Sequence, residues 1–404
     1  MAKRWMIAVA LLTVVTVCMS CAHANSWLRR YGGELLVFGA DLLRAPDGGY
    51  FVVGTVHYED ERSDIYLLRI DRSGEQQWEA FYGGDLREQA ACMLLEEGNG
   101  LLLAGTTGSY GAGGLDAYLL RVSEDGTEVW SQTYGGSLDE MAVEILSTAD
   151  GGYALIANLV DPGDFVAHAD EAGYGGLEGR SSLDIIRLDA DCNELWSRTY
   201  DSGENVLASS GLETPDGGFL VLGTTMYYPR RDDNDIVLLR VGSSGDTVWQ
   251  RTWDSDRATA YDIIETSDGN YLIGGSTAPI GTGASVVDAL LVSVDIDGNE
   301  RWQTTLGDPQ EVDFAAQLGE MPEGGFLSVG GAADIPVLAV DPDGRELWQH
   351  TLPVGCHTLF GELIQHPDGG YVAVGSAVCW PASDVFVARL DASGRFPLDQ
   401  GQPE

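Results

Sequence analysis

Tryptophan recurs along this chain at nearly constant intervals, and this spacing constrains the fold more than any other feature. Seven tryptophans follow one another at separations of 51, 52, 66, 53, 53 and 46 residues: Trp27, Trp78, Trp130, Trp196, Trp249, Trp302 and Trp348. Self-similarity at a period near fifty residues is typical of a repeat architecture, in which each unit buries its apolar face only against its neighbours. The chain is therefore predicted to fold as one array of similar units.

Each repeat contains four short segments with strand character. A tryptophan opens a segment such as WSQTYGG (130–136), and an apolar run follows. A turn such as PDGG (46–49) then leads into a second apolar run, and a segment such as DIYLLRI (64–70) precedes the next tryptophan. Short strands at even spacing, separated by glycine and aspartate turns, are typical of β-propeller blades. We predict an all-β, seven-bladed β-propeller of four-stranded blades.

The two ends of the chain complement each other. Residues 25–33 resemble an outermost strand without its three partners, whereas the last repeat ends without the tryptophan that is due. We predict that residues 25–33 complete the last blade and close the ring, because closure removes an exposed sheet edge. The propeller then occupies residues 25–396, followed by a short tail at 397–404.

The first 24 residues have the pattern of a secretory signal peptide. Lys3 and Arg4 precede an apolar stretch, and Ala22-His23-Ala24 provides an A-x-A cleavage site. The pattern predicts export, to a secreted, cell-surface or periplasmic location. A lipoprotein attached through Cys21 is less favoured, because Cys18 stands where a leucine-like residue is expected.

The charge of the chain limits its partners. The formal net charge is −41, which repels nucleic acid phosphates and anionic lipid headgroups. We therefore expect no nucleic acid partner and no membrane insertion, and we expect a monomer that binds a protein or a glycan. The same acidity also suits a saline habitat.

The repeat resembles a known family. The pattern W-x-x-x-Y-G-G, D-G-G-Y and L-L-R before the next tryptophan is similar to repeats of exported bacterial and archaeal β-propellers. The stretch AVDPDGRELW (339–348) is also similar to the tryptophan-docking motif of quinoprotein propellers, but no adjacent-cysteine pair is present to suit a quinone. The resemblance implies the fold and export, and no cofactor.

Several repeated residues are expected to be structural. We expect the seven tryptophans to wedge between blades. An aspartate begins the third strand of most repeats: Asp64, Asp116, Asp235, Asp288, Asp334 and Asp384. We expect these carboxylates to accept N–H groups of their own loops; the alternative is a ring of calcium or substrate ligands. Cys356 and Cys379 fall on the same face of the last blade and are predicted to form a disulfide, while Cys92 is expected to be buried and Cys192 replaces a turn glycine.

Ligand binding is expected on the face that carries the variable loops, because variable loops on a rigid scaffold usually form binding surfaces. The candidate binding residues are Tyr227, Tyr228, Arg230, Arg231, Phe165, His168, Tyr174 and Trp380. The long loop at 158–184 also offers oxygen ligands for Ca²⁺ at Asp161, Asp164 and Asp170. The other interpretation of both sets is an ordinary solvated loop.

Catalysis has little support in the sequence. No HExxH or G-x-S-x-G motif is present, and the 63 acidic residues make chance carboxylate pairs common. The sequence favours a non-enzymatic binding scaffold. Two alternatives stay open: a carbohydrate-active hydrolase or lyase with acids on the variable face, and a calcium-stabilised surface protein. Clustered acids of raised pKa around the central axis would favour the hydrolase.

Overall fold

The computed structural model describes residues 27–33, 35–96, 98, 100–161, 180–201, 205–225, 234–253, 257–278, 287–307, 312–331, 335–352, 354–379, 382–391 and 394. Within these ranges the chain forms 28 β-strands and no helix. Every repeat supplies strands because its β-branched and aromatic residues alternate with glycine and aspartate turns.

Five of the sheets contain four antiparallel strands each, in sequence order. The first is β6 (Glu88–Leu95), β7 (Leu101–Thr107), β8 (Asp116–Val122) and β9 (Glu128–Tyr134). The second is β10 (Asp139–Ser147), β11 (Tyr153–Val160), β12 (Ser181–Leu188) and β13 (Glu194–Tyr200). The third is β14 (Val206–Glu213), β15 (Phe219–Thr225), β16 (Ile236–Val241) and β17 (Thr247–Trp253). The fourth is β18 (Thr259–Glu265), β19 (Tyr271–Thr277), β20 (Asp288–Val294) and β21 (Glu300–Leu306). The fifth is β22 (Asp313–Glu320), β23 (Phe326–Gly331), β24 (Ile335–Val340) and β25 (Glu346–Leu352).

The remaining strands form one eight-stranded sheet that contains both ends of the described chain. It consists of β1 (Trp27–Tyr31), β2 (Leu36–Arg44), β3 (Tyr50–His57), β4 (Ser63–Ile70), β5 (Gln76–Tyr82), β26 (His357–Gln365), β27 (Tyr371–Cys379) and β28 (Ala382–Leu390). Strand β1 pairs antiparallel with β28, with Trp27 opposite Arg389 and Tyr31 opposite Val385. The two halves of this sheet meet at a single parallel pair, Leu36 and Ser383.

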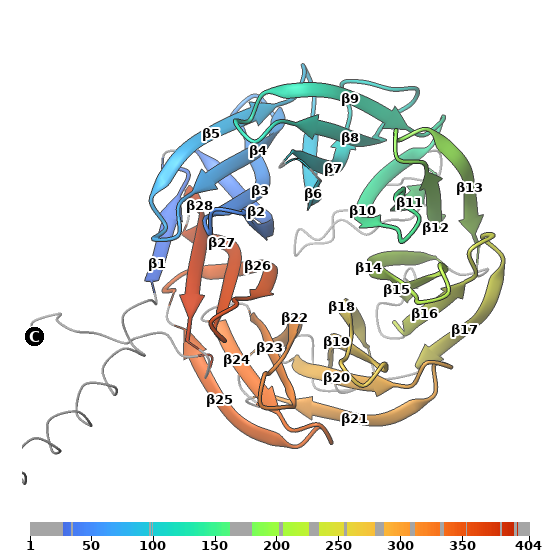
Figure 1. Cartoon of the computed structure of the whole chain (residues 1–404), viewed down its shortest axis with the longest axis vertical. Helices are drawn as coiled ribbons and strands as arrows, with labels where there is room; N and C mark the ends of the chain where they lie inside the picture. Colours follow the sequence, from blue (N-terminus) through green and yellow to red (C-terminus); the bar gives the residue numbers. More distant parts are fainter. Residues whose placement is uncertain are drawn as a thin grey trace, which may run out of the picture.

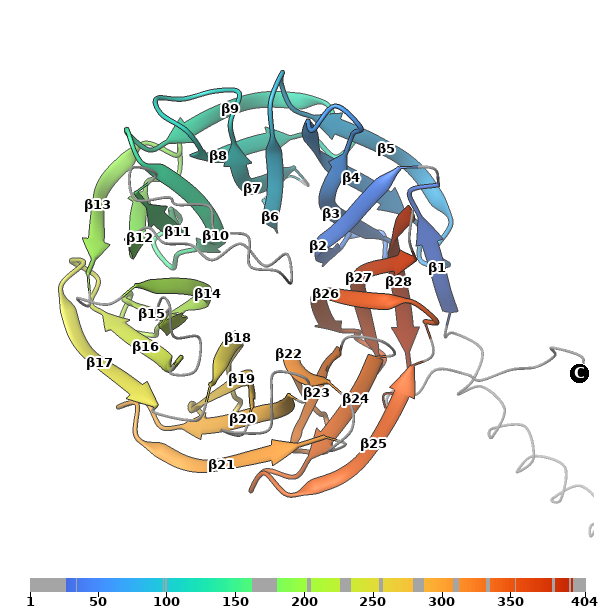
Figure 2. The same cartoon turned by 180° about the vertical axis from the view of Figure 1, so that it is seen from behind.

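The sheets stand around a common axis and form a β-propeller (Figure 1). Strands β2, β6, β10, β14, β18, β22 and β26 are innermost, and β5, β9, β13, β17, β21 and β25 lie on the rim. The view from behind shows β1 beside β28 on the outer side of the ring (Figure 2). The first and last described strands therefore lie next to each other.

The apolar core of the described residues is divided into seven clusters, and each cluster contains side chains of two neighbouring groups of strands. Phe51 and Leu67 of β3 and β4, for example, share a cluster with Leu103 and Leu120 of β7 and β8. Exactly one residue of the tryptophan series packs against each cluster, so the periodic tryptophans lie between neighbouring sheets.

A close contact between tryptophan and glycine explains two features of the repeat. Gly126 has φ +81° in the turn between β8 and β9, and a Cβ there would lie 2.8 Å from the Trp78 ring of the preceding rim strand. The hydroxyl of Tyr82 donates to the Gly126 carbonyl at 2.6 Å. The same tryptophan contact recurs at five more turn glycines: Gly74, Gly245, Gly298, Gly344 and Gly394. At these six turns the close approach of the tryptophan favours glycine, whereas Cys192 holds the equivalent position in the turn after Trp130.

An arginine clamp explains the DGG and LLR segments. The side chain of Arg69 is only 6% exposed, and its Nη2 lies 2.6 Å from Asp47 in the turn before β3. Arg187 pairs in the same way with Asp150, and Arg240 pairs with Asp216. A Cβ at Gly49 would collide with the Arg69 guanidinium. The second glycine of DGG therefore leaves room for the arginine.

The cysteines fall into two groups. Cys356 and Cys379 form a disulfide with their Cα atoms 5.2 Å apart. Cys92 and Cys192 are free and buried, and Cys192 has φ +62° at the position that glycine holds in the other turns. The Arg30 side chain of β1 donates to the Val354 carbonyl at 2.5 Å beside the disulfide.

The tryptophan–glycine contact can be tested with a matched pair of variants. Gly126→Ala should lower the free energy of unfolding by about 1–3 kcal/mol more than Gly151→Ala. Both positions have positive φ, but a Cβ at Gly151 meets nothing within 4 Å, so the difference isolates the clash with Trp78. Urea unfolding followed by tryptophan fluorescence measures the free energy of unfolding of both variants. Equal losses would contradict the assigned role of the contact.

Candidate functional site: a ring of polar side chains at the axis

The innermost strands share an irregularity at the same place. In every repeat the pairing with the second strand shifts register just before one residue, for instance between Gly39 and Asp41 and between Ala90 and Cys92. A bulge of this kind re-aims the side chain that follows it. That side chain is polar in all seven strands: Asp41, Cys92, Glu144, Ser210, Asp262, Gln317 and Glu362.

Several of these side chains bond to the next sheet around the ring. Asp41 Oδ2 accepts the Met93 N–H at 2.7 Å, and Asp262 Oδ2 accepts the Leu318 N–H at 2.9 Å. Cys92 Sγ accepts the Ile145 N–H at 3.1 Å. Each donor directly follows the polar residue of its own strand, so one sheet satisfies a backbone group of the next. The polar position therefore joins neighbouring sheets.

Four carboxyl groups in this ring influence one another. Burial raises the pKa of Asp41 and of Asp262 to about 6. Burial, followed by the charges of Asp41 and Asp262, raises the pKa of Glu144 and Glu362 well above the ordinary value. These residues come from β2, β10, β18 and β26, which are spread around the ring (Figure 1). All four strands are innermost in the ring (Figure 1), and the negative charges of Asp41 and Asp262 add to the effect of burial on the pKa of Glu144 and Glu362.

A second set of acids lies where the YGG segments enter the next sheet. A Cβ at Gly83 would meet the carboxylates of Asp64 and Glu88 together, and a Cβ at Gly135 would meet those of Asp116 and Glu140. The first glycine of YGG thus gives room to a pair of acids that belong to neighbouring sheets.

The two acid pairs differ in their hydrogen bonds. Glu88 Oε1 accepts the Thr107 hydroxyl at 2.7 Å, and its Oε2 accepts the Gly84 N–H at 2.9 Å. Leu159 stands opposite Glu140 where Thr107 stands opposite Glu88, and Glu140 Oε2 is buried with no hydrogen-bond partner. Burial and then the nearby acids, Asp116 first, raise the pKa of Glu140 to about 7 despite a bond from the Gly136 N–H.

Two of the repeated aspartates accept hydrogen bonds from their own loops, and one of these bonds comes from a backbone N–H. Asp116 accepts the Ala112 N–H of its own loop at 3.0 Å, and Asp64 accepts the Tyr58 hydroxyl at 2.8 Å. Asp288 and Asp384 lie on β20 and β28, and Asp235 directly precedes β16. Asp334 lies outside the described residues.

Most predicted ligand-binding residues lie outside the described part of the chain: Asp164, Phe165, His168, Asp170, Tyr174, Tyr227, Tyr228, Arg230, Arg231 and Trp380. Asp161 is described, and its N–H donates to the Arg180 carbonyl at 3.1 Å. Within the described ranges no three acidic, histidine or cysteine side chains are grouped closely enough to hold a metal ion. The calcium hypothesis therefore rests on residues that are not described.

Sequence reasoning missed the axial ring. A signal was available, because a polar residue or cysteine stands two positions after the small residue of six repeats, as in Gly39-Ala40-Asp41 and Ala142-Val143-Glu144, and Glu362 follows Phe360 in the same way in the last repeat. The amphipathic pattern of a strand does not show which face points to the axis, so only the bulge and the ring identify the position.

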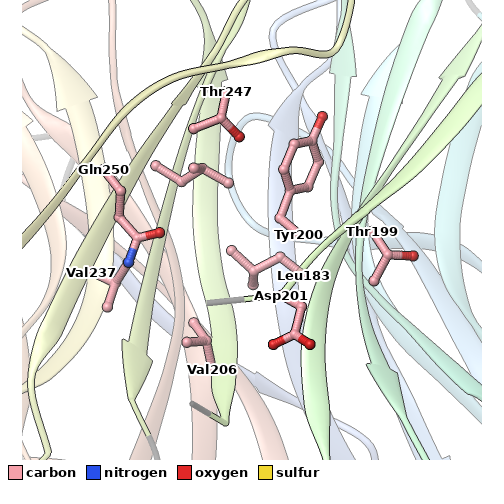
Figure 3. Close-up of a pocket in the computed structure, with 9 residues that line it drawn as sticks. Leu183, Thr199, Tyr200, Asp201, Val206, Val237, Thr247 and Gln250 are labelled. Atoms are coloured by element: carbon pink, nitrogen blue, oxygen red, sulfur yellow. The ribbon is translucent and has the colours of Figure 1, made fainter. Parts of the chain in front are cut away.

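A cavity of about 210 Å³ lies between β13 and β17 (Figure 3). Thr199, Tyr200, Asp201, Thr247 and Gln250 supply its polar groups, and Leu183, Val206 and Val237 line its apolar part. The cavity is a cleft between two neighbouring sheets.

The family of the chain follows from its repeats. The model of a family described as outer membrane protein assembly factor BamB matches residues 61–318. The chain belongs to this family. Membership of the BamB family agrees with the propeller fold and with the distant likeness to quinoprotein-like propellers. No curated protein is significantly similar to the chain.

Solved structures extend the likeness of this BamB-family chain beyond the matched segment. A puromycin hydrolase mutant complexed with PGG superposes with a TM-score of 0.54 at 16% identity, over 92% of this chain and 55% of that chain. A puromycin-hydrolyzing peptidase of Mycobacterium tuberculosis has a TM-score of 0.50 at 18% identity, over 93% of this chain and 54% of that chain. The likeness shows the fold, and this chain spans about half of the length of these proteins. No described segment forms a helix long and apolar enough to cross a membrane.

The axial acids predict an unusual dependence of stability on pH. Asp262 has a pKa of about 6 in the folded protein against an ordinary value of 3.8, so folding favours its protonated form. Asp262 leaves the free energy of unfolding unchanged below about pH 4, where it is protonated in both states. It lowers the free energy of unfolding as the pH rises through 6 and the carboxyl group ionises in the folded protein. Asp262→Asn, which keeps an acceptor for the Leu318 N–H, should raise the free energy of unfolding at pH 8 by on the order of 2 kcal/mol.

The control is Asp295→Asn on the short-turn face. The side chain and N–H of Asn299 lower the pKa of Asp295, so its stabilising contribution is lost only as the pH falls below about 4. Urea unfolding at pH 4 and pH 8 measures both variants. If Asp262→Asn loses as much stability relative to the unchanged protein at pH 8 as at pH 4, the ionised Asp262 carboxylate does not oppose folding.

Proposed function

We propose that this chain is an exported, non-enzymatic β-propeller scaffold that binds a protein or a glycan through its variable-loop face. Its family is described as an outer membrane protein assembly factor, which is a protein that assists the assembly of other proteins. Residues 1–24 serve as the signal peptide, residues 25–396 form the propeller, and 397–404 form a tail. The protein acts as a monomer in a secreted, surface or periplasmic location.

The scaffold has seven blades in this proposal, and the eight-stranded sheet counts as two. Its halves share only the pair Leu36–Ser383. The Trp27 ring lies against Gly74 in the same manner as Trp348 lies against Gly394, which supports one uniform contact around the whole ring. The division of the core into seven clusters also supports seven interfaces.

One observation carries the scaffold role: two acids of the axial ring bond to the backbone of the neighbouring sheet. Asp41 accepts the Met93 N–H, and Asp262 accepts the Leu318 N–H. A thiol, Cys92, makes the same axial bond as the carboxylates. An interaction that a thiol can replace is structural, since a thiol in this apolar setting is not an equivalent acid catalyst.

The variable face also carries exposed apolar groups within the described residues. Leu86 is 55% exposed and Tyr110 is 48% exposed. The Leu86 N–H bonds to the Ser109 hydroxyl at 2.8 Å, which brings the two loops together. Exposed tyrosine and leucine on a rigid surface suit a protein partner, because aromatic anchors carry much of the binding energy at interfaces.

A carbohydrate-active hydrolase or lyase is the second candidate, and the axial cluster of acids favours it. The pKa of Glu144 and of Glu362 is raised by burial and by the neighbouring acids, which is the property of a general acid. In this candidate, one protonated glutamate donates a proton to the leaving group.

A paired experiment separates the two candidates. The mature protein is immobilised, and envelope and secreted proteins of the source cells, together with a glycan array, are tested for retention. We expect retention to fall about tenfold in Leu86→Ala with Tyr110→Ala, equivalent to about 1.4 kcal/mol. Ile296→Ala is the matched control, because Ile296 is 57% exposed in a turn of the opposite face.

The same samples are assayed for release of sugars from polysaccharides. Turnover that is lost in Glu144→Gln with Glu362→Gln would replace the scaffold by the hydrolase. Retention that is equal in the Leu86/Tyr110 variant and in Ile296→Ala would remove the variable face from the proposal.

A further inference from the structure

A second cavity lies on the face opposite the variable loops. Its volume is about 680 Å³, within the range of small-molecule sites. It opens between the sheet β6–β9 and the sheet β10–β13, where the short turns of the repeat lie. Leu95, Glu96, Arg121, Thr148, Tyr153 and Ala190 line it.

The cavity coincides with a departure from the repeat. Ala45, Thr148 and Thr214 each donate their N–H to the glycine that ends the following turn, and Glu96 makes this bond to Gly100. Glu96 is thus a carboxylate at a position where the other repeats have alanine, threonine, methionine or histidine. Arg121 Nη2 bonds to Glu96 Oε1 at 2.7 Å, whereas the equivalent Arg69 bonds to Asp47 further out in its turn. The arginine is therefore turned into the cavity wall.

The tyrosine of the neighbouring DGGY segment also differs from its equivalents. Tyr50, Tyr271 and Tyr371 are at most 1% exposed. Tyr153 is partly exposed and lines the cavity, and its hydroxyl donates to Glu96 Oε1 at 2.6 Å. An aromatic ring that is sealed in the other sheets is thus open to a ligand in this one.

The polar groups of the cavity are balanced in charge. Glu96 and Arg121 neutralise each other within a chain that is otherwise strongly acidic. The Arg121 guanidinium lies 4.9 Å from the centre of the Trp130 ring, and its Nε is buried with no hydrogen-bond partner. The Glu96 carboxylate, the Arg121 guanidinium and the Tyr153 ring therefore line one cavity, and the charges of the lining side chains sum to zero.

This combination specifies the chemical class of a ligand. Hydroxyl groups both donate and accept, so they match a carboxylate beside a guanidinium. The apolar face of a sugar ring matches an exposed aromatic ring, and the lack of net charge disfavours ionic ligands. We propose that this cavity binds a neutral saccharide of one or two sugar units, stacked on Tyr153 and hydrogen-bonded to Glu96 and Arg121. The site is independent of the variable face.

Calorimetric titration of the full mature protein tests the proposal, with glucose, galactose, mannose, N-acetylglucosamine and their common disaccharides as probes. We expect at least one neutral sugar to bind at one site per chain. Ala190→Trp should fill the cavity and abolish binding, and Glu96→Gln should weaken it about tenfold, equivalent to about 1.4 kcal/mol. Ser243→Trp is the matched control, because Ser243 holds the same exposed turn position between β16 and β17 as Ala190 holds between β12 and β13.

Thermal unfolding shows that each variant is folded, since both tryptophans are introduced at exposed positions. Binding that survives Ala190→Trp, or that is lost equally in Ser243→Trp, would overturn the site. Absence of binding by every neutral sugar, or preference for glucuronate or glucosamine over the neutral sugars, would overturn the ligand class. None of these outcomes depends on the partner of the variable face.

Discussion

The structure depends on one contact that recurs at six positions around the ring: the tryptophan of an outer strand lies on the turn glycine of the neighbouring group of strands. Each unit of a repeat architecture buries its apolar face only against its neighbours, so stability comes largely from the interfaces between sheets. The tryptophan supplies a large apolar surface there, and the tyrosine hydroxyl of the YGG segment bonds to the same turn at Tyr31, Tyr82, Tyr134 and Tyr200. The first and last strands of the chain enter the same arrangement through Trp27 and Gly74.

A second constraint acts at the axis, where the innermost strands crowd together. Each strand bulges, which frees a backbone N–H, and a polar side chain of the preceding sheet accepts it at Asp41, Cys92 and Asp262. Carboxylates make this bond at the expense of burying charge in a small space. The raised pKa values of these acids are therefore a consequence of how the ring is joined. A role in catalysis would have to use acids that already have a structural task.

Function is more readily placed where the repeat is broken. Regular positions recur because the ring needs them, so they carry little information about a ligand. The interface between β6–β9 and β10–β13 departs from the repeat at Glu96 and Cys192 and in the partner of Arg121, and it contains the cavity of about 680 Å³. The loops of the variable face differ from sheet to sheet for the same reason. The two faces of the ring can thus serve two different partners.

The sequence by itself determined the repeating unit, because strand alternation, turn glycines and periodic tryptophans are local patterns with local physical causes. It also indicated a structural role for the tryptophans and an acceptor role for Asp64 and Asp116. Only the tertiary structure decided which polar residues meet at the axis, since Asp41, Glu144, Asp262 and Glu362 are far apart in sequence and converge only when the sheets stand in a ring. The cavity at Tyr153 was likewise not predictable. The cavity is lined by Arg121 and Glu96, and the pairing of these two side chains is visible only in the folded protein.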